Sequence, residues 1–261
     1  MPPQKQYYNF LVFVITAPDH FEYRDLIRKK SWAGYSWKNS NGVPITHWKY
    51  FFVAGKTNNE ELSRKMEVEI AQYKDMVIAD ELDTYHNLVL KVLWLLQFSV
   101  DNYNFGFLIK TDDDAFLNIK LLDQYFNKLL EGNNAQLFFG GALTRNQPVF
   151  RRGRYGVSAQ QWPKDTYAPY CSGGGYVLSF DTVQTLLRAH ATGKQPLFHV
   201  EDAFMGALAY LAGNIFPQNI KGVYWHQKYG CKDKKALLLH YVKGEQMVQF
   251  MSKYKQDLPY C

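Results

Sequence analysis

Short apolar runs alternate with amphipathic segments along the first half of the chain. Four runs bounded by turn residues predict buried strands, at residues 10–15, 48–54, 76–79 and 105–110. The segments between them carry apolar residues at helical spacing and predict helices, at residues 20–32, 58–73 and 88–100. Asp19 and Asn58 are expected to cap the first two helices. This alternation predicts an α/β fold, with a mostly parallel sheet covered by helices.

The second half of the chain has a less regular pattern. A helix is predicted after the fourth strand, because apolar side chains fall on one face, at Leu122, Tyr125, Phe126, Leu129 and Leu130. Further strands and helices are predicted at residues 136–141, 176–179, 181–190 and 202–212. Three consecutive glycines precede the strand at 176–179. We expect one domain over residues 1–261, because no repeat or clear linker divides the chain.

Charge and cysteine content narrow the classes of function. The formal net charge is +6 and the pI is near 9.0, without a block of like charges. The sequence has no basic stripe and no nucleic-acid-binding motif, so we expect no nucleic-acid partner. Three cysteines are too few for a disulfide scaffold, and the pairing among Cys171, Cys231 and Cys261 stays open. The apolar runs are shorter than the ~18 residues that a membrane span needs.

Three consecutive aspartates, Asp112, Asp113 and Asp114, follow the predicted strand at 105–110. Adjacent carboxylates repel one another unless a cation lies among them. An open α/β sheet binds ligands beyond the carboxyl ends of its strands, so this position predicts a divalent metal with a bound phosphate. The run is not an EF-hand loop, because Phe116 stands where a third acidic ligand is needed. The structural alternative is a helix N-terminus, whose dipole favours acidic residues.

Six motifs, in order along nearly the whole chain, resemble those of the β1,3-glycosyltransferases of glycosyltransferase family 31. Lys-Thr-Asp-Asp-Asp-Ala-Phe at 110–116 matches the family's Lys-x-Asp-Asp-Asp-x-Phe, and Glu-Asp-Ala-Phe-Met-Gly at 201–206 is similar to Glu-Asp-Val-x-x-Gly. The other four motifs lie at residues 24–32, 52–55, 83–91 and 167–177. The chain departs from the family at 154–158, where Arg-Tyr-Gly-Val-Ser lacks a bulky aromatic pair, which puts the acceptor in doubt.

The resemblance implies a GT-A-like fold, with a mostly parallel central sheet flanked by helices and a single Rossmann-like nucleotide-sugar-binding domain. It divides that domain into a nucleotide-sugar-binding half, 10–118, and an acceptor-binding half with the catalytic base, 119–261. It implies inverting, metal-dependent transfer of a hexose from a UDP-sugar to the 3-hydroxyl of an acceptor glycan, forming a β1,3 linkage. Galactose is the favoured sugar and an N-acetylhexosamine the alternative. A catalytically silent partner or chaperone of another glycosyltransferase is the competing hypothesis.

The same resemblance implies the catalytic groups. Three residues are expected to hold Mn²⁺, or Mg²⁺ as the alternative ion: Asp114, Asp112 and His240. His226 is the alternative imidazole. Asp202 is expected to be the general base that deprotonates the acceptor, and its structural alternative is a helix cap. Glu201 is expected to orient the acceptor or the base.

We expect nine residues to contact the donor: Thr16, Arg24, Arg28, Asp83, Lys91, Asp112, Asp113, Gly174 and Gly175. Acceptor contacts are expected from Trp162, Tyr167, Tyr170 and Glu201. Structural alternatives stay open for several of them. The arginines fit a solvated surface, the aromatic residues fit a core, and Lys91 on its apolar helix needs an anionic partner, either the diphosphate or one of two aspartates, Asp80 and Asp83.

Members of the family are usually Golgi type II membrane proteins. The resemblance therefore implies a domain in the Golgi lumen, with a membrane anchor outside this segment. The acceptor glycan would belong to a glycoprotein, a glycolipid or a proteoglycan. The sequence pattern does not indicate an oligomeric state.

Overall fold

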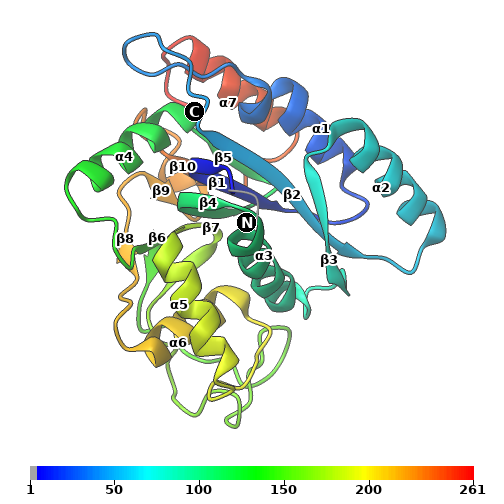
Figure 1. Cartoon of the computed structure of the whole chain (residues 1–261), viewed down its shortest axis with the longest axis vertical. Helices are drawn as coiled ribbons and strands as arrows, with labels where there is room; N and C mark the ends of the chain where they lie inside the picture. Colours follow the sequence, from blue (N-terminus) through cyan, green and yellow to red (C-terminus); the bar gives the residue numbers. More distant parts are fainter. Residues whose placement is uncertain (1–4) are drawn as a thin grey trace.

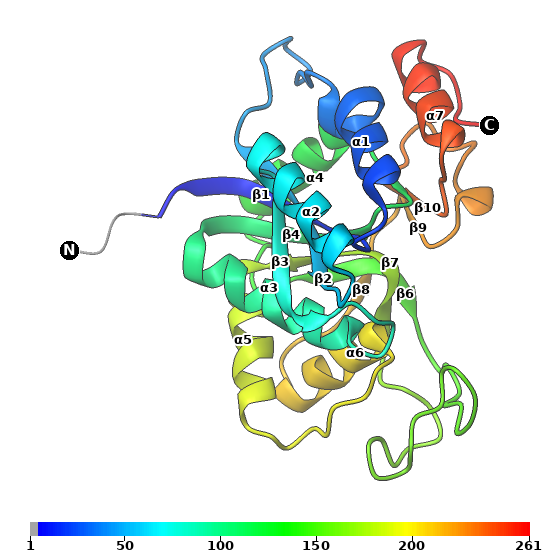
Figure 2. The ribbon, with the colours of Figure 1, turned by 90° about the vertical axis from the view of Figure 1, so that its right-hand side faces the viewer.

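The computed structural model describes residues 5–261, and residues 1–4 of the expected domain lie outside it. Helices cover both faces of a central sheet, as Figures 1 and 2 show. The strand order across this sheet is β3-β2-β1-β4-β7-β6-β8. Its strands are β1 (Tyr7–Ile15), β2 (Trp48–Lys56), β3 (Met76–Leu82), β4 (Asn104–Asp112), β6 (Phe139–Thr144), β7 (Tyr170–Ser179) and β8 (Gln218–Asn219).

The first four strands, β1 to β4, run parallel to one another. β7 is antiparallel to both of its neighbours, and β8 pairs parallel with β6. The predicted GT-A-like α/β fold with a mostly parallel sheet is therefore confirmed. In the register of β1 and β4, Ile15 lies opposite Asp112, and the N–H of Asp113 donates to the carbonyl of Ile15 at 3.0 Å. The carboxyl ends of the two central strands thus meet at the acidic run.

A second, small sheet brings the C-terminal part of the chain to the acidic run. It consists of β5 (Ala115–Leu117), β10 (Leu238–His240) and β9 (Val223–Tyr224). β5 follows the aspartates directly, and its antiparallel register with β10 places His240 opposite Ala115. His240 therefore becomes a neighbour of Asp114, although the two residues are far apart in the sequence.

The helices form two layers, one on each face of the sheet. They are α1 (Phe21–Lys30), α2 (Glu60–Tyr73), α3 (Leu88–Asn102), α4 (Ile119–Glu131), α5 (Phe180–Ala191), α6 (Glu201–Ala212) and α7 (Glu245–Lys255). Successive side chains of a strand point to opposite faces. Leu11 and Phe13 of β1 accordingly pack with α3, α5 and α6, whereas Phe10 and Val12 pack with α1, α2, α4 and α7.

Several local predictions are wrong in detail. His20 rather than Asp19 is the N-cap of α1, and Asn59 rather than Asn58 is the N-cap of α2. The three consecutive glycines lie inside β7 instead of preceding it. β6 begins three residues later than predicted, at Phe139. The short strands β5, β8, β9 and β10 and the helix α7 were not predicted.

The cysteine pairing left open by the sequence is resolved in the structure. Cys231 and Cys261 form a disulfide, and Cys171 is buried without a sulfur partner among the described residues. Burial raises the pKa of the Cys171 thiol, so this cysteine is a poor nucleophile at neutral pH. No helix within residues 5–261 is long and apolar enough to cross a membrane.

Candidate active site

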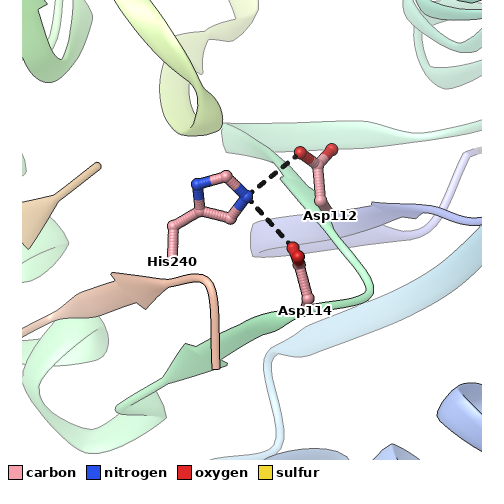
Figure 3. A group of neighbouring side chains, drawn as sticks. All are labelled: Asp112, Asp114 and His240. Carbon is pink, nitrogen blue, oxygen red and sulfur yellow. Dashed lines mark ion pairs between the residues drawn. The ribbon is translucent and has the colours of Figure 1, made fainter. Parts of the chain in front are cut away.

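Asp112, Asp114 and His240 form a compact group at the carboxyl end of β4 (Figure 3). Nε2 of His240 lies 3.0 Å from Oδ1 of Asp114 and 3.6 Å from Oδ2 of Asp112. One ligand atom of each residue lies within 4.8 Å of the other two, a spacing at which the three groups can share one cation. The structure thus brings together the three residues expected to hold a metal.

The orientation of the His240 imidazole is fixed by a backbone hydrogen bond and by close packing against Gly174. Nδ1 lies 2.9 Å from the carbonyl oxygen of Trp225, so Nδ1–H donates there and the lone pair of Nε2 faces the aspartates. Gly174 backs the ring, because a Cβ at this position would lie 2.2 Å from Nδ1. Gly175 packs just as closely on Leu238 of β10. Two carboxylates and one imidazole fit Mn²⁺ or a similar divalent ion.

The charges in this group compensate one another. Burial disfavours the Asp114 carboxylate, but the hydrogen bond to His240 and the charges of His240 and Lys243 together outweigh burial and lower the pKa of Asp114. Burial also acts to lower the pKa of His240, yet the two aspartates outweigh it and the pKa is raised. The two carboxylates therefore favour a positive charge bound at the lone pair of Nε2, either a proton or a metal cation. His226, the alternative imidazole, lies outside the group and accepts from the N–H of Lys228.

A cavity of about 340 Å³ opens beside this group, between the ends of β1 and β4. Five of the expected donor-binding residues line it: Thr16, Asp83, Lys91, Asp112 and Asp113. A larger hollow of about 840 Å³ lies between α1 and α2, away from the aspartates. We take the smaller cavity as the candidate donor site, because its wall contains Asp112, Asp114 and His240. We call these three residues the metal-type group.

Asp113 turns toward the loop after β1 rather than toward His240. Its Oδ2 accepts from the hydroxyl of Thr16 at 2.6 Å and lies 2.7 Å from Nδ1 of His20. The hydrogen bond to Asp113 raises the pKa of His20 against the effect of burial. The side chain of His20 is 40% exposed and lines the cavity. Sequence reasoning missed this residue, although its position just beyond β1 is the signal that could have identified it.

Lys91 finds its anionic partner in the structure. Its Nζ lies 2.6 Å from Oδ2 of Asp83 and donates to the carbonyl of Thr16 at 3.1 Å. Asp80 pairs instead with Lys56 at the surface. Burial lowers the pKa of Lys91, and Asp83 only partly offsets this effect. Lys91 thus carries a buried, neutralised charge at the wall of the cavity.

Arg24 and Arg28 face the core rather than the cavity with the metal-type group. They are 1% and 8% exposed, so the solvated-surface alternative is wrong. Arg24 pairs with Glu69 at 2.7 Å, and Arg28 pairs with Glu69 at 2.6 Å and with Asp75 at 2.7 Å. Arg24 reaches the candidate donor site only through the loop after β1, where its guanidinium donates to the hydroxyl of Thr16 at 3.2 Å and to the carbonyl of Ala17 at 2.6 Å.

A second pair of carboxylates, Glu201 and Asp202, begins α6. The oxygens of Asp202 accept from the backbone N–H groups of Gly173 at 3.0 Å and Ala203 at 2.8 Å. Glu201 is buried and accepts from the hydroxyl of Tyr176 at 2.6 Å. Asp202 is half-buried, so it is the member of the pair that a hydroxyl group can reach from outside.

Lys110 connects the two acidic groups. It is 1% exposed, and its Nζ donates to Asp112 at 2.9 Å and to the carbonyl of Gly173 at 2.6 Å. It also lies 3.4 Å from Glu201. The N–H of Gly173 in turn donates to Asp202, so one buried cation joins the metal-type group to the second carboxylate pair. Sequence reasoning assigned no role to Lys110, although a lysine ending an apolar strand was a visible signal.

Burial dominates the ionisation of the second pair. It raises the pKa of Asp202 against the two backbone N–H groups and Lys110, which favour the carboxylate. It raises the pKa of Glu201 in the same way, against the attraction of Lys110. A carboxylate with a raised pKa is a stronger proton acceptor than one in water. Asp202 is therefore suited to general-base chemistry.

Two of the expected acceptor residues lie in the core. Trp162 and Tyr167 are 4% and 6% exposed, and both rings pack on Phe198, with centroids 6.4 and 5.9 Å away. Trp162 and Tyr167 therefore have the core environment that was the structural alternative to acceptor contact. Tyr170, at the start of β7, is half-buried beside Tyr167.

The chain is similar in sequence to known glycosyltransferases. A family model described as galactosyltransferase matches residues 22–217. The chain is 26% identical to hydroxyproline O-galactosyltransferase GALT2 of Arabidopsis thaliana, over 97% of this chain and 36% of that protein. It is 29% identical to beta-1,3-galactosyltransferase 1 of Homo sapiens, over 91% and 72%. It is 34% identical to lactosylceramide 1,3-N-acetyl-beta-D-glucosaminyltransferase of Homo sapiens, over 83% and 57%. The chain thus spans only part of the length of these relatives.

Solved structures with a similar outline are more distant. TarS 1–349 of S. aureus is 12% identical, with a TM-score of 0.41 over 83% of this chain and 59% of that chain. The apo-form glycosyltransferase GlyE of Streptococcus pneumoniae TIGR4 is 12% identical, with a TM-score of 0.42 over 91% and 55%.

Proposed function

Because this chain belongs to the galactosyltransferase family, whose model matches residues 22–217, we propose that it is an inverting, metal-dependent β1,3-glycosyltransferase. It transfers a hexose from a UDP-sugar to the 3-hydroxyl of an acceptor glycan, with galactose favoured over an N-acetylhexosamine. One observation carries the proposal: the metal-type group and the carboxylate pair at the start of α6 are joined through Lys110 and Gly173. The first suits a diphosphate-bound cation, and the second suits a proton acceptor.

The first group serves the departure of the diphosphate. Asp112, Asp114 and His240 would hold Mn²⁺, with Mg²⁺ as the alternative, and the bound ion would act as a Lewis acid on the leaving group. Lys91, held by Asp83 and by the carbonyl of Thr16, lies in the wall of the same cavity and fixes the loop after β1 there. Asp113, linked to Thr16, would contact the ribose or the sugar, because carboxylates readily accept hydrogen bonds from hydroxyl groups.

The second group serves the attack of the acceptor. Asp202 accepts the proton of the 3-hydroxyl as that oxygen bonds to the anomeric carbon from the face opposite the diphosphate, which inverts the configuration. The N–H groups of Gly173 and Ala203 hold its carboxylate in place. Glu201, fixed by Tyr176 and Lys110, positions the start of α6.

The other expected residues take supporting roles in this proposal. Asp83 neutralises Lys91, and Gly174 and Gly175 let β7 approach β10 closely. Arg24 and Arg28 act on the donor indirectly, because their ion pairs fix the loop after β1. We retain residues 10–118 as the donor half and 119–261 as the acceptor half.

The family resemblance suggests where such a reaction takes place. We propose that the domain works in the Golgi lumen, on glycans of glycoproteins, glycolipids or proteoglycans, as part of a type II membrane protein. This part of the proposal rests on the family and not on the geometry of the site.

Turnover of a UDP-sugar panel tests the proposal. With Mn²⁺, the protein is expected to hydrolyse UDP-galactose slowly without an acceptor, and EDTA is expected to stop the reaction. Asp202→Asn should abolish transfer while UDP and Mn²⁺ still bind. Asp80→Asn is the matched control, because this carboxylate is 75% exposed and, within residues 5–261, forms an ion pair only with Lys56 at the surface.

Two results would contradict the proposal in different ways. Unchanged transfer by the Asp202→Asn variant would refute the base assignment alone. Failure of the unaltered protein to turn over any UDP-sugar with Mn²⁺ would instead favour the silent-partner hypothesis.

A further inference from the structure

The loop between β6 and β7, residues 145–169, projects from the body of the molecule (Figure 2). It carries five basic residues and one acidic residue, so most of the chain's net charge of +6 is concentrated in it. Arg151 shapes the loop internally, because its guanidinium donates to the carbonyls of Val157, Trp162 and Lys164. The loop therefore has a defined path and a positive potential.

One arginine of this loop lies on an aromatic surface. The guanidinium carbon of Arg154 is 4.4 Å from the ring centroid of Tyr85 and 5.7 Å from that of Tyr155. Nε2 of His199 lies 2.7 Å from the carbonyl oxygen of Arg154. The ring of Tyr85 packs edge-on against both Tyr155 and His199, with centroids 5.9 and 6.0 Å away. Three segments distant in sequence thus build one basic-aromatic surface: Tyr85, Arg154, Tyr155 and His199.

The basic-aromatic surface adjoins both acidic groups of the candidate active site. Tyr85 lines the donor cavity together with Asp112 and Asp114. His199 lies two residues before Glu201 in the segment that leads into α6. Burial, Tyr155 and then Asp202 raise the pKa of Tyr85 to about 12, which agrees with a phenol close to the proposed base.

Arg154 has unused binding capacity. It is exposed, and no carboxylate oxygen of residues 5–261 forms an ion pair with it within 4.0 Å. A guanidinium presents a fork of N–H donors that matches a carboxylate or a sulfate bidentately. The half-exposed ring of Tyr155 beside it offers an apolar face on which a sugar ring can pack.

We propose that the basic-aromatic surface is the acceptor subsite and that it selects an acceptor sugar with an anionic group, a carboxylate or a sulfate. This inference rests on the proposed function, because Asp202 must act on the sugar held here. The sugar ring packs on Tyr155, and Arg154, held on the ring of Tyr85, binds the anionic group. Glu201 and Asp202 would repel an acidic sugar, and the guanidinium offsets that repulsion.

Two pairs of glycosides test the inference by binding alone. One pair is p-nitrophenyl β-galactoside and its 6-sulfate, and the other is p-nitrophenyl β-glucoside and β-glucuronide, so the members of each pair differ in the anionic group. Dissociation constants are measured by calorimetry with UDP and Mn²⁺ present. The protein is expected to bind at least one anionic glycoside about tenfold more tightly than its neutral counterpart. The pair that shows the preference identifies the anionic group as a sulfate or a carboxylate.

Arg154→Gln is expected to abolish the preference for the anionic member. Arg145→Gln removes the same charge from the same loop, but Arg145 lines a separate hollow beside Tyr210 and Phe216, so this variant is expected to keep the preference. Tyr155→Ala should weaken the binding of both glycosides of a pair alike, since it removes the surface on which the sugar packs and leaves the guanidinium of Arg154 in place.

The inference would be overturned if the two glycosides of each pair bound with equal affinity. It would also be overturned if Arg154→Gln and Arg145→Gln reduced the preference for the anionic glycoside equally. Hydrolysis of each UDP-sugar of the panel, without an acceptor and with Mn²⁺, is measured in parallel. If hydrolysis is absent while the Arg154-dependent preference persists, the proposed function fails and the surface remains a site for anionic saccharides. If hydrolysis is present and the preference is absent, the inference fails and the proposed function stands.

Discussion

Gly174 positions a candidate metal ligand by having no side chain. A Cβ there would lie 2.2 Å from Nδ1 of His240, and the ring cannot retreat without losing its hydrogen bond to the carbonyl of Trp225. We therefore expect Gly174→Ala to displace the imidazole and to weaken Mn²⁺ binding by about 10- to 100-fold, measured by isothermal titration calorimetry.

The neighbouring glycine provides the control for this variant. A Cβ at Gly173 would lie 3.5 Å from the carboxylate of Asp202, an ordinary van der Waals distance. Gly173→Ala is therefore expected to bind Mn²⁺ as the unaltered protein does. If Gly174→Ala also kept full affinity, His240 would not be a metal ligand.

Asp114 links cation binding to donor binding. Asp114→Asn keeps the size of the side chain but removes the charge that faces Nε2 of His240. UDP affinity in the presence of Mn²⁺ is expected to fall at least about tenfold, because under the proposed function Asp114 would help to hold the ion that neutralises the diphosphate. Asp80→Asn should leave this affinity unchanged. UDP binding by the Asp114→Asn variant that is as tight as in the unaltered protein would refute the ligand role.

At the scale of single residues, the sequence indicates chemical type better than it indicates burial. The family resemblance drew attention to Asp112, Asp114 and His240, and the structure brings these side chains together. The same reasoning expected Trp162 and Tyr167 to meet the acceptor, but both rings are buried. Aromatic residues occur in cores and at binding surfaces alike, and only the packing partners distinguish the two cases.

At the scale of elements, a repeated apolar pattern made prediction successful. β1, β2, β4 and α3 contain enough residues for the pattern to be recognised, and all four were found. β5 and β10 have three residues each, too few for any periodicity. They form because of tertiary contacts: Phe116 pairs with Leu239 across the strands and packs on Phe250 of α7, with ring centroids 5.9 Å apart.

The contact between α1 and α2 depends on one buried carboxylate. Glu69 of α2 pairs with both Arg24 and Arg28, and all three side chains are buried. Glu69→Gln removes the negative charge that neutralises the two buried guanidinium groups. The free energy of unfolding is therefore expected to fall by about 3 kcal/mol. Glu61→Gln is the control, since Glu61 forms an exposed pair with Lys65 on the same helix, and its loss should leave the free energy of unfolding nearly unchanged. Urea denaturation measures the free energy of unfolding of both variants. An equal decrease in the two variants would contradict the role assigned to Glu69.

The same carboxylate predicts a pH dependence. Burial acts to raise the pKa of Glu69, but the two arginines outweigh it, and the pKa in the folded state is lowered. A lowered pKa stabilises the fold above the ordinary glutamate value of about 4.3, and this contribution is lost as the pH falls through the folded-state pKa. The stability difference between the unaltered protein and Glu69→Gln should therefore narrow below about pH 4 in urea titrations. A difference that stayed constant with pH would show that the ion pairs are not its cause.

At the scale of the whole molecule, the candidate site draws on both expected halves of the chain. β1 and β4 supply the aspartates and the cavity wall, whereas β7, α6 and β10 supply Gly174, Asp202 and His240. The sequence predicted the order of the motifs but not this convergence, because the register of β5 and β10 places His240 beside the acidic run. The division at 118 and 119 therefore stays a functional proposal.

The disulfide between Cys231 and Cys261 closes a segment, with a sequence separation of 30 residues, that contains β10 and thus His240. Closing a loop of this length stabilises a fold by roughly 3–4 kcal/mol, because the unfolded chain loses conformations. We expect Cys261→Ser to lower Tm by about 8 °C in calorimetry, and to weaken Mn²⁺ binding because β10 is held less firmly. Dithiothreitol should lower the Tm of the unaltered protein to that of the variant and leave the variant unchanged. An equal shift of both proteins would mean that the reductant acts elsewhere than at this bridge.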